Sequence, residues 1–423
     1  MLCPYRRKGS HMMRIRPDLL DENSPDEIEV FQLTTEEVPS CHVYMEAQVF
    51  APDSKRFVLH RSARAHGNDK NDPEHRYLVC DIDDGCRLRP ITEELGATAP
   101  AVSPDGKYLY YLVNETEIGG GKLTLRRVNL DGRDRRTLTV LDGPIPGTTF
   151  RPSRIYPLST ISSDGKRLAA AAFLGDGKTE GAPFGLMVFD LERATVELVL
   201  HGPRWCNLHP QYSRSTGPEH SHDIMVQDNH GNVTDAAGVV SRYRSGAGPD
   251  IHVLRDDGTD FRNLPWGRDG NEFCQGHECW RGRSIWAITS TSTRAPAEAQ
   301  LIESVASPHT GHVGINTPGA VRNDLSCTFP RPDFHHFATD IAGTRLITDA
   351  GPFDAGGRIF LADLDEPGAG PATRWTFLLS PRSSCRKETH IHPFLSPDGS
   401  MAFFNSDESG VLQAYMIRGL GAI

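Results

Sequence analysis

One short turn recurs along this chain and restricts the possible folds more than any other feature. Each copy has an apolar or small residue, a Ser/Ala-Pro/Ser-Asp-Gly sequence or a variant of it, a basic residue and an alternating apolar strand. Clear copies begin at Ala51, Ser103, Ser162 and Ser396, and weaker ones near Tyr212, Trp280 and Ile341. The resulting seven units have roughly the 40–50-residue spacing of propeller blades, or somewhat more.

A second hairpin signal lies between successive turns. An apolar strand ends in an acidic turn, as at Asp84-Gly85, Asp131-Gly132 and Asp257-Gly258, and a further strand follows. Asp-Gly between alternating apolar runs is a strong signal for a tight hairpin. Inner and outer hairpins that alternate seven times predict an all-β fold, a seven-bladed β-propeller of four-stranded antiparallel blades. The alternative is a pair of β-sandwiches, which would not need the same turn at regular intervals.

We expect this propeller to occupy residues 14–423 as a single domain. The chain of 423 residues exceeds the size of one ordinary core, and its 40 glycines and 30 prolines are spread evenly instead of being gathered into linkers. Residues 1–13 are basic and contain Gly-Ser-His-Met, which resembles an expression scar more than a signal peptide. We therefore exclude this lead from the fold.

Charge and cysteine usage restrict the partners and the compartment. The net charge is −10 and the body has no basic run, which argues against nucleic acid or an anionic membrane as a partner. A small anionic substrate is compatible with this charge, because a local metal ion or arginine can override the global field. Nine dispersed cysteines without a Cys-x-x-Cys pair indicate reduced thiols in a cytoplasmic protein. We expect a monomer or a homodimer.

Several histidines occupy comparable places in successive repeats. His209, His277, His336 and His390 each lie a few residues before a repeat turn, on what would be the innermost strand of a blade. Innermost strands line the central channel of a propeller, so these side chains should converge there. His392 follows His390 at i+2, and residues i and i+2 of a strand share a face. Alternatively, each is a hydrogen-bonded structural histidine.

This convergence predicts a metal site, because imidazole nitrogens bind borderline divalent ions well. His277, His390 and His392 would supply three nitrogens and leave positions open for a substrate oxygen and water. Glu388, on the same strand face, or Gln275 would complete the ligand set. The alternative is an outward-facing His-x-His pair on a solvent face. Substrate contacts are expected from His336, Lys387, Trp280, His230 and Gln275, with packing as the alternative role of Trp280.

Four histidine-containing segments also carry a family resemblance. They are Trp205-Cys206-Asn207-Leu208-His209-Pro210, Gly276-His277-Glu278-x-Trp280, His336 eight residues before Thr344, and Thr389-His390-Ile391-His392-Pro393 followed by Ser396-Pro397-Asp398-Gly399. In these segments, and over the body from about Val38, the sequence resembles the oligogalacturonate lyases, seven-bladed-propeller polysaccharide lyases of pectin degradation. The resemblance implies a manganese-type ion held by three histidines and a glutamine, a histidine base and a nearby arginine. Carried over, the ligands would be His277, His390 and His392, and the base His209.

Two positions depart from the family pattern. Lys387 stands where the family has its glutamine ligand, and Gly185 stands where it has its catalytic arginine. Arg204 and Arg214, close to His209 in the sequence, are the candidate replacements for that arginine. The resemblance implies Mn²⁺ as the metal, with Zn²⁺, Ni²⁺ and Ca²⁺ as alternatives.

The activity that the resemblance implies is β-elimination on a 4-linked oligouronide. A histidine base would take the weakly acidic C5 proton, while a metal ion on the carboxylate stabilises the enediolate. A neutral imidazole titrates near 6.5 and suits proton transfer near neutral pH. The two departures leave other functions open: a metal-dependent hydrolase, isomerase or epimerase on another sugar acid, or a non-catalytic sugar-binding propeller.

Overall fold

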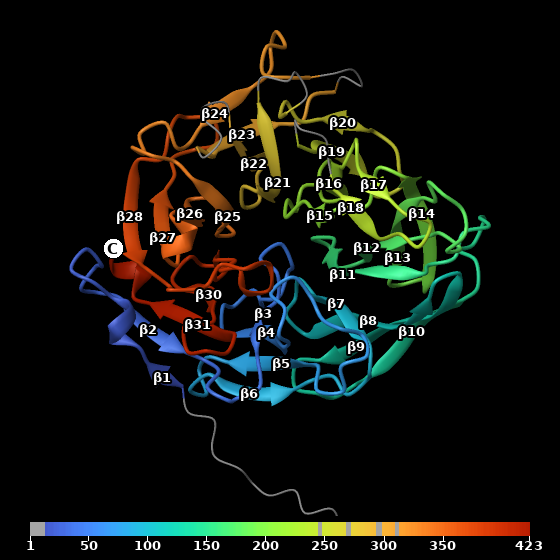
Figure 1. The fold of residues 1–423 in the computed structure, drawn as a ribbon, viewed down its shortest axis with the longest axis horizontal. Helices are drawn as coiled ribbons and strands as arrows, with labels where there is room; N and C mark the ends of the chain where they lie inside the picture. Colours follow the sequence, from blue (N-terminus) through green and yellow to red (C-terminus); the bar gives the residue numbers. More distant parts are fainter. Residues whose placement is uncertain (1–12, 244–247, 268–271, 293–297, 309–312) are drawn as a thin grey trace, which may run out of the picture.

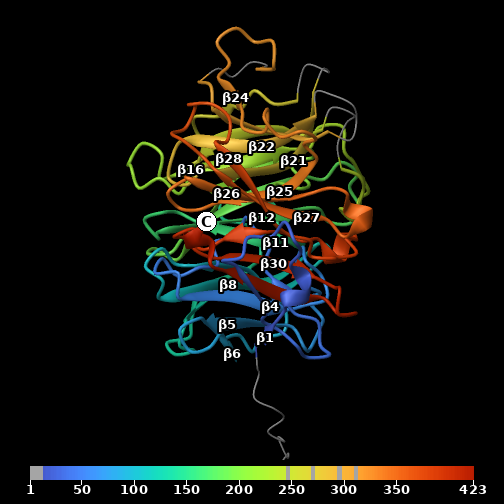
Figure 2. The same cartoon turned by 90° about the vertical axis from the view of Figure 1, so that its left-hand side faces the viewer.

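Seven β-sheets surround a central channel in the computed structural model (Figure 1), and Figure 2 shows the same ring from its edge. The structure describes residues 13–243, 248–267, 272–292, 298–308 and 313–423. Six of the sheets have four antiparallel strands, and the seventh has five. The predicted seven-bladed β-propeller is therefore confirmed. The lead predicted at residues 1–13 lies, apart from Met13, outside the described residues.

In blades 1 to 3 the strands follow the chain from the channel to the rim (Figure 1). Blade 1 contains β3 (Cys41–His42), β4 (Arg56–Arg61), β5 (Arg76–Asp81) and β6 (Arg87–Pro90). Blade 2 contains β7 (Ala97–Val102), β8 (Tyr108–Glu117), β9 (Gly120–Asn129) and β10 (Arg136–Asp142). Blade 3 contains β11 (Arg154–Ile161), β12 (Arg167–Phe173), β13 (Phe184–Asp190) and β14 (Thr195–Gly202).

Blades 4 to 6 have the same order, and blade 4 carries an additional hairpin. Blade 4 contains β15 (Gln211–Tyr212), β16 (Asp223–Asp228), β19 (Asp250–Arg255) and β20 (Arg262–Asn263), with the hairpin of β17 (Val233–Thr234) and β18 (Val240–Arg242). Blade 5 contains β21 (Phe273–Trp280), β22 (Trp286–Ser292), β23 (Gln300–Val305) and β24 (Arg322–Asp324). Blade 6 contains β25 (Phe334–Thr339), β26 (Arg345–Ala350), β27 (Arg358–Asp363) and β28 (Arg374–Leu379).

Strands from both ends of the described chain close blade 7. The C-terminal part supplies the three inner strands, β29 (Phe394–Leu395), β30 (Ala402–Ser406) and β31 (Gln413–Arg418). The N-terminal part supplies the two outer strands, β2 (Glu29–Gln32) and β1 (Arg14–Ile15). Because β2 pairs with β31, the ring closes in the blade that follows His390 and His392.

An ion pair between Arg16 and Glu408 stabilises this closure. The Arg16 guanidinium donates to both carboxylate oxygens of Glu408, with an Nη2–Oε2 distance of 2.9 Å, and the Arg16 side chain is only 10% exposed. Replacing Arg16 by alanine leaves a mostly buried carboxylate without its cation, so the free energy of unfolding should fall by about 1.5–3 kcal/mol. Denaturant unfolding measures this loss. Arg14→Ala, an exposed position two residues earlier, is the control, and an equal effect of both substitutions would contradict the role of Arg16.

The repeated turns surround one mouth of the channel, which we call the turn side. In the copy of blade 2, the Ser103 hydroxyl donates to Asp105 at 2.6 Å, and Asp105 accepts the backbone N–H of Lys107 at 3.1 Å. Gly106 has φ 69°, and a Cβ there would lie 2.8 Å from Cδ of Pro52 in the preceding turn. Only glycine fits this approach without strain. The turn sequence thus reflects the packing of one blade against the next.

The innermost strands are interrupted near the opposite mouth, which we call the histidine side. Register shifts occur between Thr98 and Ala101 in β7, Ile155 and Ser159 in β11, Cys274 and Glu278 in β21, and Phe334 and Phe337 in β25. In blades 4 and 7, His209 and His392 have φ 45°, and each precedes a proline and a two-residue innermost strand. Such irregularities bend a strand and re-aim its side chains. They therefore direct side chains from several blades toward one mouth.

Residues 43–49 cross the channel between the two mouths, and we call this segment the plug. It begins after β3 of blade 1, and Gln48 hydrogen-bonds the backbone N–H and carbonyl of Ile161 in blade 3 at 2.6 and 2.9 Å. Tyr44 contacts histidines on the histidine side, whereas Met45 and Val49 line a cavity on the turn side. The plug thus separates the histidine side of the channel from this turn-side cavity.

Helix is almost absent from the described residues. The short 3-10 helices are η1 (Pro17–Leu19), η2 (Phe353–Ala355), η3 (Lys387–Thr389) and η4 (Leu420–Ala422). Among the described residues, no helix has the length and apolar character needed to cross a membrane. The eight described cysteines are free thiols.

Candidate metal centre and active site

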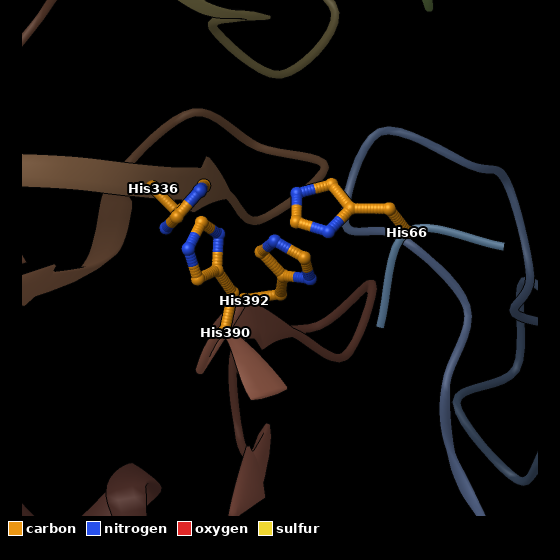
Figure 3. Close-up of side chains that lie close together, drawn as sticks. All are labelled: His66, His336, His390 and His392. Carbon is orange, nitrogen blue, oxygen red and sulfur yellow. The ribbon is translucent and has the colours of Figure 1, made fainter. Parts of the chain in front are cut away.

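Four imidazoles meet on the histidine side of the channel, and we call them the four-histidine cluster (Figure 3). His66 comes from the loop between β4 and β5, His336 from β25, and His390 and His392 from the segment before β29. Each offers one nitrogen, and these nitrogens all lie within 4.8 Å of one another. Four imidazole nitrogens this close together can hold one divalent ion.

The ring nitrogens of the cluster fit a metal ion because many of them have no hydrogen-bond partner. Buried without a partner are Nδ1 of His66, Nδ1 of His390, Nε2 of His336 and both ring nitrogens of His392. An unpaired buried polar atom is costly, and a bound cation would remove that cost. Nδ1 of His336 donates to Asp349 at 2.9 Å, so its Nε2 keeps a lone pair for a ligand bond.

Burial keeps the four rings neutral, which is the state that binds metal. It lowers the pKa of His66 to about 3 and also lowers the pKa of His390. The pKa values of His336 and His392 lie well below the usual range because of burial and then because of the neighbouring histidines. Burial raises the pKa of Asp349 to about 6.

These lowered pKa values predict how the metal-free protein responds to pH. Folded His66 has a pKa of about 3 and an unfolded histidine one near 6.5, so between these values the unfolded state binds more protons. Stability should therefore be complete above about pH 6.5 and decline as the pH falls toward 3, by up to about 1.4 kcal/mol per pH unit for this one group. Denaturant unfolding of chelator-treated protein measures the slope. His66→Asn should make it shallower, and an unchanged slope would contradict the prediction.

His66 could not be predicted from the repeat, because this residue lies outside the repeat register. A backbone hydrogen bond from Ala65 N–H to the Glu388 carbonyl, at 2.9 Å, holds its loop beside the other histidines. The His66 ring centroid lies 4.8 Å from that of His390 and 4.5 Å from that of His392. The available signal was the length of the loop, residues 62–75, between two adjacent strands.

The structure brings His390 and His392 together, but not through a shared strand face. Residues 387–389 form η3, and Pro393 has no N–H with which to lengthen the two-residue strand β29. The predicted strand over the His-x-His pair is therefore wrong. The two rings nevertheless lie 5.4 Å apart, with an angle of 84° between their planes.

The 3-10 turn also changes the expected roles of its first two residues. Glu388 was predicted as a ligand from the strand face, but its side chain is exposed and the cluster does not include its carboxylate. Lys387 is exposed as well, and its Nζ lies 5.7 Å from the ring centroid of Tyr243. The charge of Lys387 adds to the lowering of the pKa values of His66 and His390, so this cation acts close to the cluster.

His277 lies beside the cluster instead of within it. Its ring centroid is 4.4 Å from that of His336, yet its nitrogens are not among the four that converge. His277 lies within the register shift of β21 between Cys274 and Glu278. The structure therefore replaces His277 by two other candidate ligands, His66 and His336; the second was predicted to contact the substrate.

Gln275 and Trp280 lie on the same strand as His277. The Gln275 side chain accepts a hydrogen bond from Ser290 at 2.8 Å. Trp280 is buried, and its Nε1 donates to the Gln211 carbonyl at 2.9 Å, so it packs between blades 4 and 5. Packing, not substrate contact, is thus the role that the structure shows for Trp280.

His209 belongs to a hydrogen-bonded chain next to the cluster. Its Nδ1 hydrogen-bonds the plug residue Glu46 at 2.8 Å, and its Nε2 hydrogen-bonds the hydroxyl of Tyr156, on β11, at 2.8 Å. The ring of Tyr44 lies 5.6 Å from that of His209 and 4.5 Å from that of His392, between centroids. One aromatic ring therefore links the histidine expected to act as base with the candidate metal ligands.

Burial also raises the pKa values of the acidic groups around His209. It raises the pKa values of Glu46 and Tyr156 well above their usual range. It raises the pKa of Glu278 to about 8, and the nearby Glu46 adds to this shift. Gln227 donates to the two Glu278 oxygens at 3.0 and 2.9 Å. This set of groups can hold and exchange protons near neutral pH.

Arg204 and His230 belong to a separate group of charged side chains on blade 4. Arg204 Nη2 pairs with the buried carboxylate of Asp228 at 2.8 Å. His230 Nδ1 lies 3.7 Å from a carboxylate oxygen of Asp250. The structure brings neither side chain to the four-histidine cluster, because these carboxylates hold them at the ends of β16 and β19.

Arg214 lies on the turn side of the plug, away from the cluster. It follows β15, and a strand advances about 3.3 Å per residue, so the five positions after His209 carry the chain along the channel wall. There Arg214 lines the turn-side cavity with Gln48 and Thr339. The structure therefore does not bring Arg214 to His209, and a role for Arg214 beside His209 stays a prediction from the sequence.

Comparison with known proteins gives the fold but no sequence family. No family model and no curated protein matches the chain. Two solved structures match over 96% of both chains at 15% identity and a TM-score of 0.67: an oligogalacturonate lyase in complex with manganese, and an oligogalacturonate lyase from Vibrio parahaemolyticus. A GH74 xyloglucanase from Xanthomonas campestris matches at a TM-score of 0.51 and 15% identity, over 89% of this chain and 52% of that one. The propeller architecture is shared with all three.

Proposed function

We propose that this protein is a divalent-metal-dependent lyase that cleaves a 4-linked oligouronide by β-elimination. The observation that carries the proposal is a cluster of four imidazoles with unpartnered nitrogens beside the Glu46–His209–Tyr156 chain. The likeness in fold to two oligogalacturonate lyases, one of them a manganese complex, supports it.

His66, His336, His390 and His392 would hold the metal ion. A bound divalent ion would neutralise the carboxylate of the uronide and act as a Lewis acid toward the charge that develops on it. Imidazole ligands suit Zn²⁺ or Ni²⁺ better than Ca²⁺, which prefers oxygen ligands. We favour Mn²⁺ because of the manganese complex among the similar structures. Elemental analysis of the purified protein tests this assignment.

Tyr156 and His209 would move the proton. The Tyr156 oxygen takes the C5 proton of the uronide while its own hydroxyl proton passes to Nε2 of His209, and the carboxylate form of Glu46 pairs with the imidazolium through Nδ1. The electrons of the C5–H bond form the C4–C5 double bond and the bond from C4 to its oxygen breaks. The departing oxygen can take the proton held by the pair. Tyr156 is half-buried, whereas His209 is buried, which favours Tyr156 as the group that meets the substrate.

The proposed partner is a small anionic oligosaccharide. Lys387 and Arg386 are exposed next to His390 and, together with the exposed Glu388, give this turn a net positive charge in a protein whose net charge is −10. Charge that opposes the overall field attracts an anion locally and steers it to the site. Removing Lys387 would therefore weaken substrate binding more at low than at high ionic strength.

A screen of short oligouronides tests the function. The ultraviolet absorbance of an unsaturated product should increase with time, and a chelator should abolish the increase. New reducing ends without ultraviolet absorbance would indicate a metal-dependent hydrolase instead. A changed sugar configuration without cleavage would indicate an epimerase or isomerase. Binding without any product would indicate a sugar-binding propeller, and each of these three outcomes would overturn the proposal.

A further inference from the structure

The plug leaves a second chamber on the turn side of the channel, with a volume of about 180 Å³. Its wall is largely apolar and includes Met45, Phe50, Val102, Ile161 and Leu395. Because the plug lies between this chamber and the four-histidine cluster, the chamber is separate from the proposed active site. The proposed reaction does not involve this chamber.

One guanidinium faces this apolar chamber. Arg214 is half-buried among the lining residues, and burial lowers its pKa. No carboxylate among the described residues forms an ion pair with it. Asp340, whose charge reaches Arg214, directs Oδ1 to the backbone N–H groups of Thr344 and Arg345 at 2.9 and 3.0 Å. A desolvated guanidinium has five N–H donors and is costly to leave without an acceptor.

We propose that this turn-side chamber binds a small carboxylate with an apolar body. The carboxylate would form a bidentate pair with Arg214, and the body would pack on Met45, Phe50 and Ile161. Arg283, exposed at the mouth, adds a second positive charge. The chamber has about six times the ~30 Å³ that a water molecule occupies, which suits a ligand of about six to eight heavy atoms.

The surrounding turns do not cancel this charge complementarity. Their acidic side chains accept hydrogen bonds within their own turns, as Asp105 does from the Ser103 hydroxyl and as Asp398 does from the Ser396 hydroxyl, both at 2.6 Å. The lining of the chamber includes the serines and prolines of these turns but not their aspartates. An incoming carboxylate therefore meets the guanidinium of Arg214 at the wall and none of the aspartates of these turns.

Hexanoate is a suitable probe, with hexanamide as an uncharged ligand of nearly the same shape. In calorimetric titrations of the purified protein, hexanoate should bind at least 10-fold more tightly than hexanamide. Arg214→Gln should weaken hexanoate binding at least 10-fold and leave hexanamide binding unchanged. Equal binding of the two ligands, or equal binding of hexanoate to the variant, would overturn the proposal.

Two further arms separate this chamber from the metal site. Chelator treatment and His392→Ala should both leave hexanoate binding unchanged, whereas binding that is lost in either would assign hexanoate to the metal and overturn the proposal. The lyase assay can fail without any effect on this result. Thr216→Trp, at an exposed position in the chamber lining, should block hexanoate even if Arg214→Gln does not fold. In crystals soaked with 6-bromohexanoate, bromine should lie in this chamber, and bromine elsewhere would refute the site.

Discussion

His392→Ala is expected to remove the divalent metal and to lower lyase activity about a thousandfold or more. His392 is fully buried, and neither of its ring nitrogens has a protein partner. Its ring contacts those of His66, His336 and His390, so its loss opens the centre of the ligand set. Lewis-acid stabilisation is worth several kcal/mol, and each 1.36 kcal/mol is about tenfold in rate. Elemental analysis and the ultraviolet assay on the same sample measure both losses.

A matched pair of substitutions decides which residues complete this ligand set. His66 and His277 are both half-buried, and both rings lie within 5 Å of a cluster ring, but only His66 contributes one of the four converging nitrogens. His66→Ala should therefore lose the metal, and His277→Ala should retain it. The reverse result would restore the ligand set that the family resemblance implies.

Tyr156→Phe is expected to lower the turnover number by about 10²–10⁴-fold while the metal content stays unchanged. Phenylalanine keeps the ring packing on His209 and removes only the hydroxyl that hydrogen-bonds Nε2. That range is typical for the loss of positioned acid–base catalysis. Turnover at saturating oligouronide, with elemental analysis, provides the measurement.

Tyr111→Phe is the control for this substitution. The Tyr111 hydroxyl interacts with Glu94 and Arg135 in the outer parts of the ring, at 3.1 and 2.9 Å, and touches none of the proposed catalytic groups. Its removal should lower stability slightly and leave turnover within about twofold. Full activity in Tyr156→Phe together with inactivity in His209→Ala would show instead that His209 meets the substrate directly.

Turn chemistry made the propeller predictable from the sequence. Ser103 and Asp105 form the hydrogen bonds of their own turn, and Gly106 leaves space for the preceding turn. The same residue types therefore recur wherever two blades meet. In the weak copy of blade 5, Gly282 keeps the same role, because a Cβ there would lie 2.5 Å from the backbone of Gly343. The closure by β1 and β2 could not be predicted in this way. These strands are short, and β2 pairs with residues nearly the whole chain away.

The site was predictable only where it follows the repeat. His209, His390 and His392 stand just before repeat turns, and the structure places all three at the channel. His66 depends on a loop between two blade strands, which no repeat pattern marks. Tyr44 and Glu46 belong to the plug, a segment that leaves the innermost strand of blade 1. Its path depends on tertiary packing, so the sequence pattern does not predict it. Arg214 was predicted near His209 because the two residues are close in sequence. An innermost strand runs along the channel, however, so five residues of extended chain carry Arg214 away from His209.

The interruptions of the innermost strands give each blade one replaceable position at the histidine-side mouth. In blade order these positions are Tyr44, Ala99, Tyr156, His209, His277, His336 and His392. Such a residue already departs from regular pairing, so exchanging its side chain leaves the hydrogen-bonded ladders of the sheet intact. A new reaction could therefore evolve blade by blade on an unchanged frame.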